Sequence, residues 1–124
     1  MAIALEAKGE PVNGILDGTL MVYTYPGMGT VRVSYRDGSV SFEWIDGPLK
    51  GEAGQDFAYR ARKVGEDRFF VNWHEPEAHG FVTLHIDFQA GHVHSSVLAA
   101  YATSEEQVLF HRASIGSVER SCES

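Results

Sequence analysis

The segment Val71-Asn72-Trp73-His74-Glu75-Pro76 places a carboxylate at the end of an apolar strand pattern. Because side chains alternate along a β-strand, Val71, Trp73 and Glu75 share one face. A carboxylate on an apolar face must be paired, protonated or at the rim of the core. The apolar wall of Trp73 would disfavour the charged form and make Glu75 a candidate general acid. The alternative is a solvated carboxylate at a strand end before Pro76.

Two tyrosines, Tyr23 and Tyr25, lie two residues apart and project to one side of an earlier strand. Phenols in such positions can donate hydrogen bonds to an anionic ligand oxygen, or they can pack with the hydroxyl on a protein partner. We predict that Tyr23, Tyr25 and Glu75 converge on one cavity. The residue pattern alone leaves the packing alternative open.

Six histidines raise the question of a metal site. His92 and His94 form a His-x-His pair on one strand face, and such a pair can bind zinc or iron. The pattern supplies no third ligand, because it places His74 and His85 on the outer face. We therefore predict neither a metal nor a cofactor. The sequence also lacks a phosphate-binding glycine loop, a Gly-x-Ser-x-Gly motif and a Cys-x-x-Cys motif, so serine or cysteine nucleophiles have no support.

The composition is that of an ordinary globular domain, and residues 1–124 are predicted to form one domain. A formal net charge of -7 argues against nucleic acid and anionic membrane surfaces as partners. No apolar run approaches the roughly 20 residues of a membrane span. The first residues lack a basic region and a long apolar stretch, so no signal peptide is expected and a cytoplasmic location is predicted. The single cysteine, Cys122, lies in a polar tail and is interpreted as incidental.

Turn signals recur along the chain and separate short segments rich in β-branched and aromatic residues. This spacing predicts an all-β protein, an antiparallel barrel of eight or nine strands with little helix. Asp37-Gly38 is a tight hairpin signal. Residues 2–8 and 102–107 are the candidates for a turn of helix, but neither carries a convincing apolar stripe. The predicted strands are 19–25, 30–36, 39–45, 56–64, 68–75, 81–88, 92–100 and 107–114.

The alternation within these strands assigns their faces. Apolar residues alternate with polar or charged ones, as in Val40, Phe42 and Trp44 against Ser41 and Glu43. The predicted inward set is Val31, Val33, Tyr35, Val40, Phe42, Trp44, Phe57, Tyr59, Ala61, Val82, Leu84, Ile86 and Phe88. An eight-stranded barrel has room for packed side chains or for one small ligand.

The order of Tyr23-Thr24-Tyr25, then Gly47 to Gly51, then Trp73-His74-Glu75-Pro76 resembles the bacterial phenolic acid decarboxylases. Those proteins are lipocalin-like (calycin) barrels that need no cofactor, and their marks are Tyr-Thr-Tyr near the start and Trp-Thr-Glu-Pro in the middle. The resemblance covers roughly residues 19–115. The segment Phe81 to Val97 is more similar to the related barrel domains called molybdenum cofactor biosynthesis protein F-like, or MoaF-like.

The resemblance implies that Tyr23 and Tyr25 hold a substrate and that Glu75 donates a proton. In the decarboxylases an arginine completes this set. Here Glu52 stands at its place, after Gly47-Pro48-Leu49-Lys50-Gly51. An anion at that place opposes an anionic substrate, so efficient decarboxylation of phenolic acids is not expected. Lys50 is close in sequence, but it is a point charge with a different reach.

Three hypotheses follow. The chain is a small-molecule-binding barrel that acts as a cofactor-free lyase or isomerase, a non-catalytic binding or accessory protein, or a structural dimer with a filled interior. The first two imply a small hydrophobic or aromatic ligand, and a homodimer is compatible with all three. The predicted ligand-binding residues are Phe42, Trp44, Glu52, Tyr59, Val71, Trp73, Val82 and Leu84.

Overall fold

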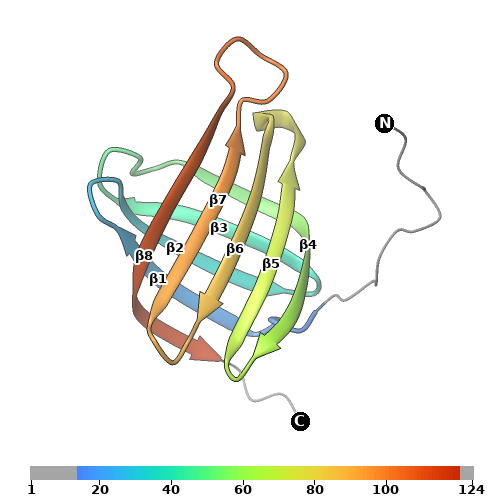
Figure 1. Ribbon diagram of the computed structural model, residues 1–124, viewed down its shortest axis with the longest axis vertical. Helices are drawn as coiled ribbons and strands as arrows, with labels where there is room; N and C mark the ends of the chain where they lie inside the picture. The colour runs from blue at the N-terminus through green and yellow to red at the C-terminus, as the bar shows by residue number, and fades with distance from the viewer. Residues whose placement is uncertain (1–13, 121–124) are drawn as a thin grey trace, which may run out of the picture.

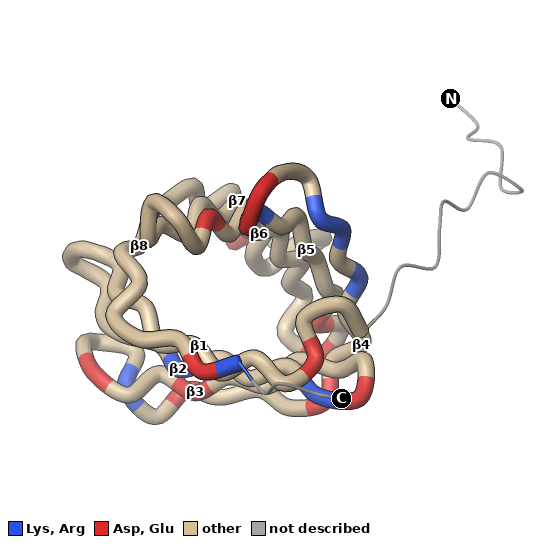
Figure 2. The backbone as a smooth tube through the Cα atoms, turned by 90° about the horizontal axis from the view of Figure 1, so that it is seen from below, with Lys and Arg blue, Asp and Glu red and all other residues tan. Residues whose placement is uncertain are grey.

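A computed structural model describes residues 14–120 as a closed antiparallel barrel (Figure 1). Each strand pairs with the next along the chain, and β8 pairs with β1 to close the ring that Figure 2 shows from below. The strands are β1 (Thr19–Tyr25), β2 (Gly29–Arg36), β3 (Ser39–Asp46), β4 (Ala53–Gly65), β5 (Arg68–Glu75), β6 (Gly80–Asp87), β7 (His92–Ala99) and β8 (Gln107–Arg120). The predicted all-β barrel is confirmed, with eight strands.

Two local predictions from the sequence are confirmed. Asp37 and Gly38 connect β2 to β3 with φ values of 53° and 75°, as a two-residue hairpin turn with both residues left-handed requires. Strand β5 ends at Glu75, and Pro76 opens the short 3-10 helix η1 (Pro76–Ala78). Proline has no N–H to donate to a strand ladder, so it ends the pairing there.

Several boundaries differ from the prediction. Strand β4 begins at Ala53 rather than at residue 56, and β8 continues to Arg120 rather than ending at 114. These extensions are largely exposed and mix glycine and apolar residues with polar ones, so they carry no clear alternation, but their backbones pair with β3 and β1. Residues 102–106 form turns instead of helix, and residues 2–8 lie outside the described residues. No helix within residues 14–120 is long and apolar enough to cross a membrane.

The predicted inward faces are confirmed. The inward residues are buried or half-buried, whereas Arg32, Arg36, Glu43 and Arg60 between them are exposed. Removing such aliphatic and aromatic surface from water contributes about 25 cal/mol per Å² to folding. The barrel interior is therefore the hydrophobic core of this molecule.

One end of the barrel is closed by a hydrogen-bonded cluster. The Tyr59 hydroxyl donates to Asp17 Oδ1 at 2.7 Å and accepts from the backbone N–H of Leu16 at 3.0 Å. Asp17 also accepts from the backbone N–H of Gly38 at 3.1 Å. The Tyr59 ring packs edge-on against Tyr35, with ring centroids 4.9 Å apart. These contacts fix the 14–18 turn across the barrel and leave the other end for a cavity.

Candidate functional site

A cavity of about 460 Å³ lies inside the barrel. Its walls come from the end of β1, the start of β2, the ends of β3, β5 and β7, and the starts of β6 and β8. Strand ends that meet at one end of a barrel bring residues distant in sequence to one place. The predicted site residues that line the cavity are Tyr23, Tyr25, Phe42, Trp44, Glu52, Trp73, Glu75, Val82 and Leu84.

Two predicted ligand-binding residues, Tyr59 and Val71, do not line this cavity. Val71 is fully buried in the packed core, and Tyr59 belongs to the closed end with Asp17 and Leu16. Both face inward, as the alternation predicted. Alternation assigns a side of the strand but not a depth along the barrel axis, so it could not separate core positions from cavity positions.

Glu75 lies on the cavity wall beside Trp73. The indole N–H of Trp73 donates to Glu75 Oε2 at 2.7 Å, and the Glu75 side chain is half-buried. Through this hydrogen bond Trp73 holds the Glu75 carboxylate in one orientation. Because the indole N–H can only donate, Oε2 accepts this hydrogen bond.

Gly80 is the cross-strand partner of Glu75. A Cβ atom at Gly80 would lie 3.6 Å from Glu75 Oε1. Gly80 is buried and also lines the cavity. Oε1 therefore lies close to a residue that borders the cavity.

Tyr23, Tyr25 and Ser95 form a second polar group in the wall. The two tyrosine rings pack edge-on, with centroids 5.7 Å apart and an angle of 77° between planes. Burial raises the pKa of Tyr23 well above its usual value, and the charge of a neighbouring Tyr25 phenolate would add to this. Burial also raises the pKa of Tyr25, and hydrogen bonds with Ser95 and Tyr23 partly offset the effect. Both phenols are therefore neutral at physiological pH and can donate or accept.

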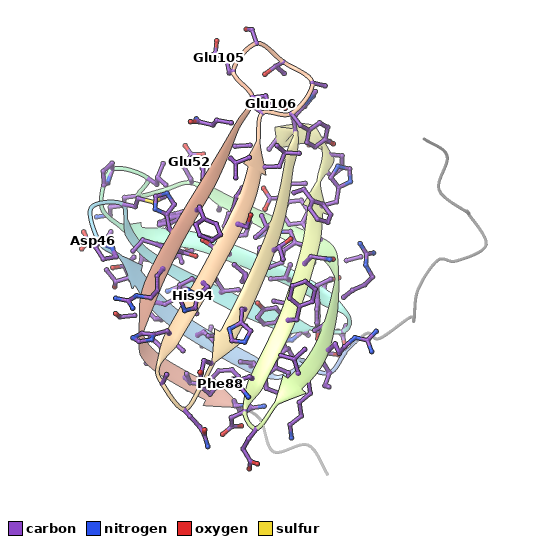
Figure 3. The ribbon with its side chains drawn as sticks, viewed as in Figure 1. Asp46, Glu52, Phe88, His94, Glu105 and Glu106 are labelled. Atoms are coloured by element: carbon purple, nitrogen blue, oxygen red, sulfur yellow. The ribbon has the colours of Figure 1, made fainter. Side chains whose placement is uncertain are left out.

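The mouth of the cavity is formed by the turn between β3 and β4. Leu49 and Glu52 line the cavity and are exposed. The backbone of Trp44 holds the base of this turn, because its N–H donates to the Glu52 carbonyl oxygen at 2.8 Å. Figure 3 shows Glu52 toward the same end of the barrel as the loop that carries Glu105 and Glu106. The mouth thus carries the Glu52 carboxylate, while Lys50 of the same turn is exposed and does not line the cavity.

Close backbone contact fixes the start of the same turn. Gly47 has a φ of +91°, and a Cβ atom there would lie 2.5 Å from Gly29 Cα. Gly29 has a φ of +122°, and a Cβ atom there would lie 2.3 Å from the Asp46 carbonyl oxygen. Glycine is the residue that tolerates both the positive φ and the close approach.

Sequence reasoning missed two polar residues of the site, Ser95 and His111. Ser95 is buried, lies between inward-facing Val93 and Val97, and pairs across strands with His111. The His111 ring centroid lies 6.2 Å from that of Tyr25. The alternation of β7 placed Ser95 inside, and β8 continues the pattern through inward-facing Leu109 and Ala113, so the signal was present.

The histidine pair considered for a metal lies outside the barrel. His94 is exposed (Figure 3), and its ring centroid is 6.3 Å from His92 and 6.2 Å from His85. Within residues 14–120, no group of three or more His, Cys, Asp or Glu side chains is arranged to hold a metal ion.

Comparison with known proteins identifies a family. The family model described as MoaF-like matches residues 17–108. Among solved structures, the crystal structure of a putative beta-lactamase from Burkholderia vietnamiensis superposes with a TM-score of 0.72 and 24% identity, over 84% of this chain and 96% of that chain. At this identity the likeness shows the fold alone. No curated protein matches the chain.

Proposed function

This chain belongs to the MoaF-like family, and we propose that its barrel binds a small, mostly apolar molecule in the cavity. The observation that carries the proposal is the cavity itself. Its volume of about 460 Å³ lies in the range of roughly 300–1,000 Å³ that is usual for ligand sites. Its walls are mainly apolar, and a few polar groups converge on it. This combination is what a site needs to bind and orient an organic ligand.

The polar groups give the ligand two attachment points. Tyr23, Tyr25 and Ser95 supply neutral hydroxyl groups on one part of the wall. Glu75 supplies a fixed carboxylate that Trp73 orients. The aliphatic residues between them, such as Val82 and Leu84, would contact the ligand body.

The experiment uses the two tryptophans of the chain, Trp44 and Trp73, which both line the cavity. Titration with the neutral probe N-phenyl-1-naphthylamine should show energy transfer from tryptophan to the probe. An Ala99→Phe variant, which adds a ring to the cavity wall, should lose most of this binding. Leu98→Phe is the matched control, because Leu98 lies on the same strand and faces outward. Binding that is unchanged in Ala99→Phe would refute the cavity as the site.

Acid–base catalysis by Glu75 is the second candidate function. The observation that favours it is the defined position of the carboxylate on the cavity wall, with Oε2 bound to Trp73 and Oε1 without a hydrogen-bond partner among the described residues. A carboxyl group in such a place can move a proton to or from a bound substrate, as a cofactor-free lyase or isomerase requires. Glu75→Gln should abolish turnover of such a substrate and leave binding of N-phenyl-1-naphthylamine within about twofold. Retained turnover in this variant would exclude Glu75 as the catalytic acid or base.

A further inference from the structure

The formally charged side chains on the cavity wall are acidic. Glu75 is half-buried at the end of β5, and Glu52 lies exposed at the mouth. Within the described part of the chain, no lysine or arginine lines this cavity. Arg32, on a strand that supplies part of the wall, points outward and pairs with Glu43 at 2.7 Å. The side chains with formal charge that line the cavity therefore favour a positive ligand, in a protein of formal net charge -7, and Lys50 in the turn at the mouth does not line it.

The Glu75 carboxylate also has acceptor capacity left for a ligand. Among residues 14–120 its hydrogen bond is the one from Trp73 to Oε2. Oε1 has no hydrogen-bond partner among these residues and lies close to Gly80, which lines the cavity. A carboxylate accepts several hydrogen bonds, and each acceptor removed from water needs a new donor. A ligand ammonium group carries two or three N–H donors and no acceptor, so it matches this position.

Electron-rich rings surround the rest of the polar region. The Tyr25 ring lies 5.7 Å from Tyr23 and 6.0 Å from Trp44, measured between centroids. Trp44 stands on the side of the cavity where Glu52 marks the mouth. The faces of tryptophan and tyrosine attract cations within about 6 Å of the ring centroid. The same rings stack on an aromatic ligand body.

From the two carboxylates, the aromatic walls and the lack of lining cations in the described chain, we infer that the cavity selects an organic cation: an ammonium group on an aromatic or aliphatic body. This inference rests on the proposed function, because it names the chemical class of the ligand for the same cavity. Glu75 receives the ammonium hydrogen bonds, and Glu52 attracts the cation at the mouth. An anion of the same shape is repelled by both carboxylates.

A matched set of three compounds tests this inference: 4-phenylbutylamine, 4-phenylbutan-1-ol and 4-phenylbutanoate. They share a body and differ in charge. Affinities are measured by isothermal titration calorimetry and by tryptophan fluorescence. The amine should bind roughly tenfold or more tightly than the alcohol, and the carboxylate more weakly than the alcohol.

Charge-neutral variants assign the selectivity to the cavity. Glu75→Gln and Glu52→Gln should each reduce the advantage of the amine over the alcohol, and the double variant should nearly abolish it. Glu43→Gln is the control, because it removes the same charge from the outer face. It should leave the ratio of affinities unchanged.

The possible outcomes separate the two proposals. Binding of the alcohol with no preference for the amine overturns the inference and leaves the binding function standing. Preference for 4-phenylbutanoate also overturns it. If Glu43→Gln reduces the preference for the amine as much as Glu75→Gln does, the amine is attracted to the net charge of the whole protein. That result overturns the assignment to the cavity. Failure of all three compounds to bind, together with failure of N-phenyl-1-naphthylamine, counts against the binding function itself.

Discussion

Two buried tyrosines that touch each other should respond very differently to loss of the hydroxyl group. The Tyr59 hydroxyl joins Asp17 and the backbone of Leu16, whereas the Tyr35 hydroxyl is buried and has no hydrogen-bond partner among the described residues. The rings are 4.9 Å apart, so Tyr59→Phe and Tyr35→Phe change the same region by the same single atom.

The magnitudes follow from what each change leaves behind. Tyr59→Phe strips the Leu16 N–H of its partner, and Leu16 is fully buried. It also removes a charge-assisted bond to Asp17, which keeps its bond from Gly38. Together these losses should lower the free energy of unfolding by about 2–4 kcal/mol. Tyr35→Phe removes a hydroxyl that is already unpaired, so it should change the free energy of unfolding by less than about 1 kcal/mol and can raise it.

Urea unfolding, followed by tryptophan fluorescence and far-ultraviolet circular dichroism, measures both effects. With a denaturant slope of about 2 kcal/mol/M, Tyr59→Phe should lower the midpoint by roughly 1–2 M, and Tyr35→Phe should leave it nearly unchanged. Equal losses in the two variants, or a larger loss in Tyr35→Phe, would refute the reasoning about the closed end of the barrel.

Three further predictions concern other parts of the molecule. Burial raises the pKa of Tyr23, so the folded state keeps a proton that the unfolded state loses above about pH 10. The urea midpoint of unfolding should therefore fall as the pH rises from about 9 to 11. The fall should be less steep in Tyr23→Phe, which lacks this proton. Gly47→Ala should lower the free energy of unfolding by more than Gly51→Ala in the same urea assay, since both have positive φ but only Gly47 faces a clash, with Gly29; equal losses would contradict the close-contact argument. Release of carbon dioxide from p-coumarate by the purified protein should be weak or absent, because Glu52 opposes an anionic substrate; rapid release would overturn that expectation.

Much of the fold was predictable because alternation and turn chemistry act locally. The residue pair Asp37-Gly38 was enough to indicate a hairpin, and the inward set from Val31 to Phe88 followed from a period of two. The end of β8 was not predictable, because residues 115–120 include a glycine and several polar residues. Their pairing with β1 depends on backbone bonds that closure of the barrel provides.

The candidate site was predictable in part for the same reason. Two-residue spacing placed Tyr23 with Tyr25, and the apolar run into Glu75 marked an acid on an inward face. The bond from Trp73 to Glu75 was not foreseen, because it depends on side-chain orientation. The position of Tyr59 along the barrel axis was not predictable from the sequence, because it depends on the pairing register of β4 with β5. The cytoplasmic location and the homodimer stay predictions.

The central claim is that the barrel cavity is a ligand site with Glu75 in its wall. A crystal structure of the protein with 4-phenylbutylamine tests it most directly. The account predicts the phenyl ring among the apolar wall residues near Leu84, the nitrogen within hydrogen-bonding distance of Glu75 Oε1, and the Trp73 bond to Oε2 retained. A compound bound only on the outer surface of the barrel, with the cavity filled by rearranged side chains, would contradict the account.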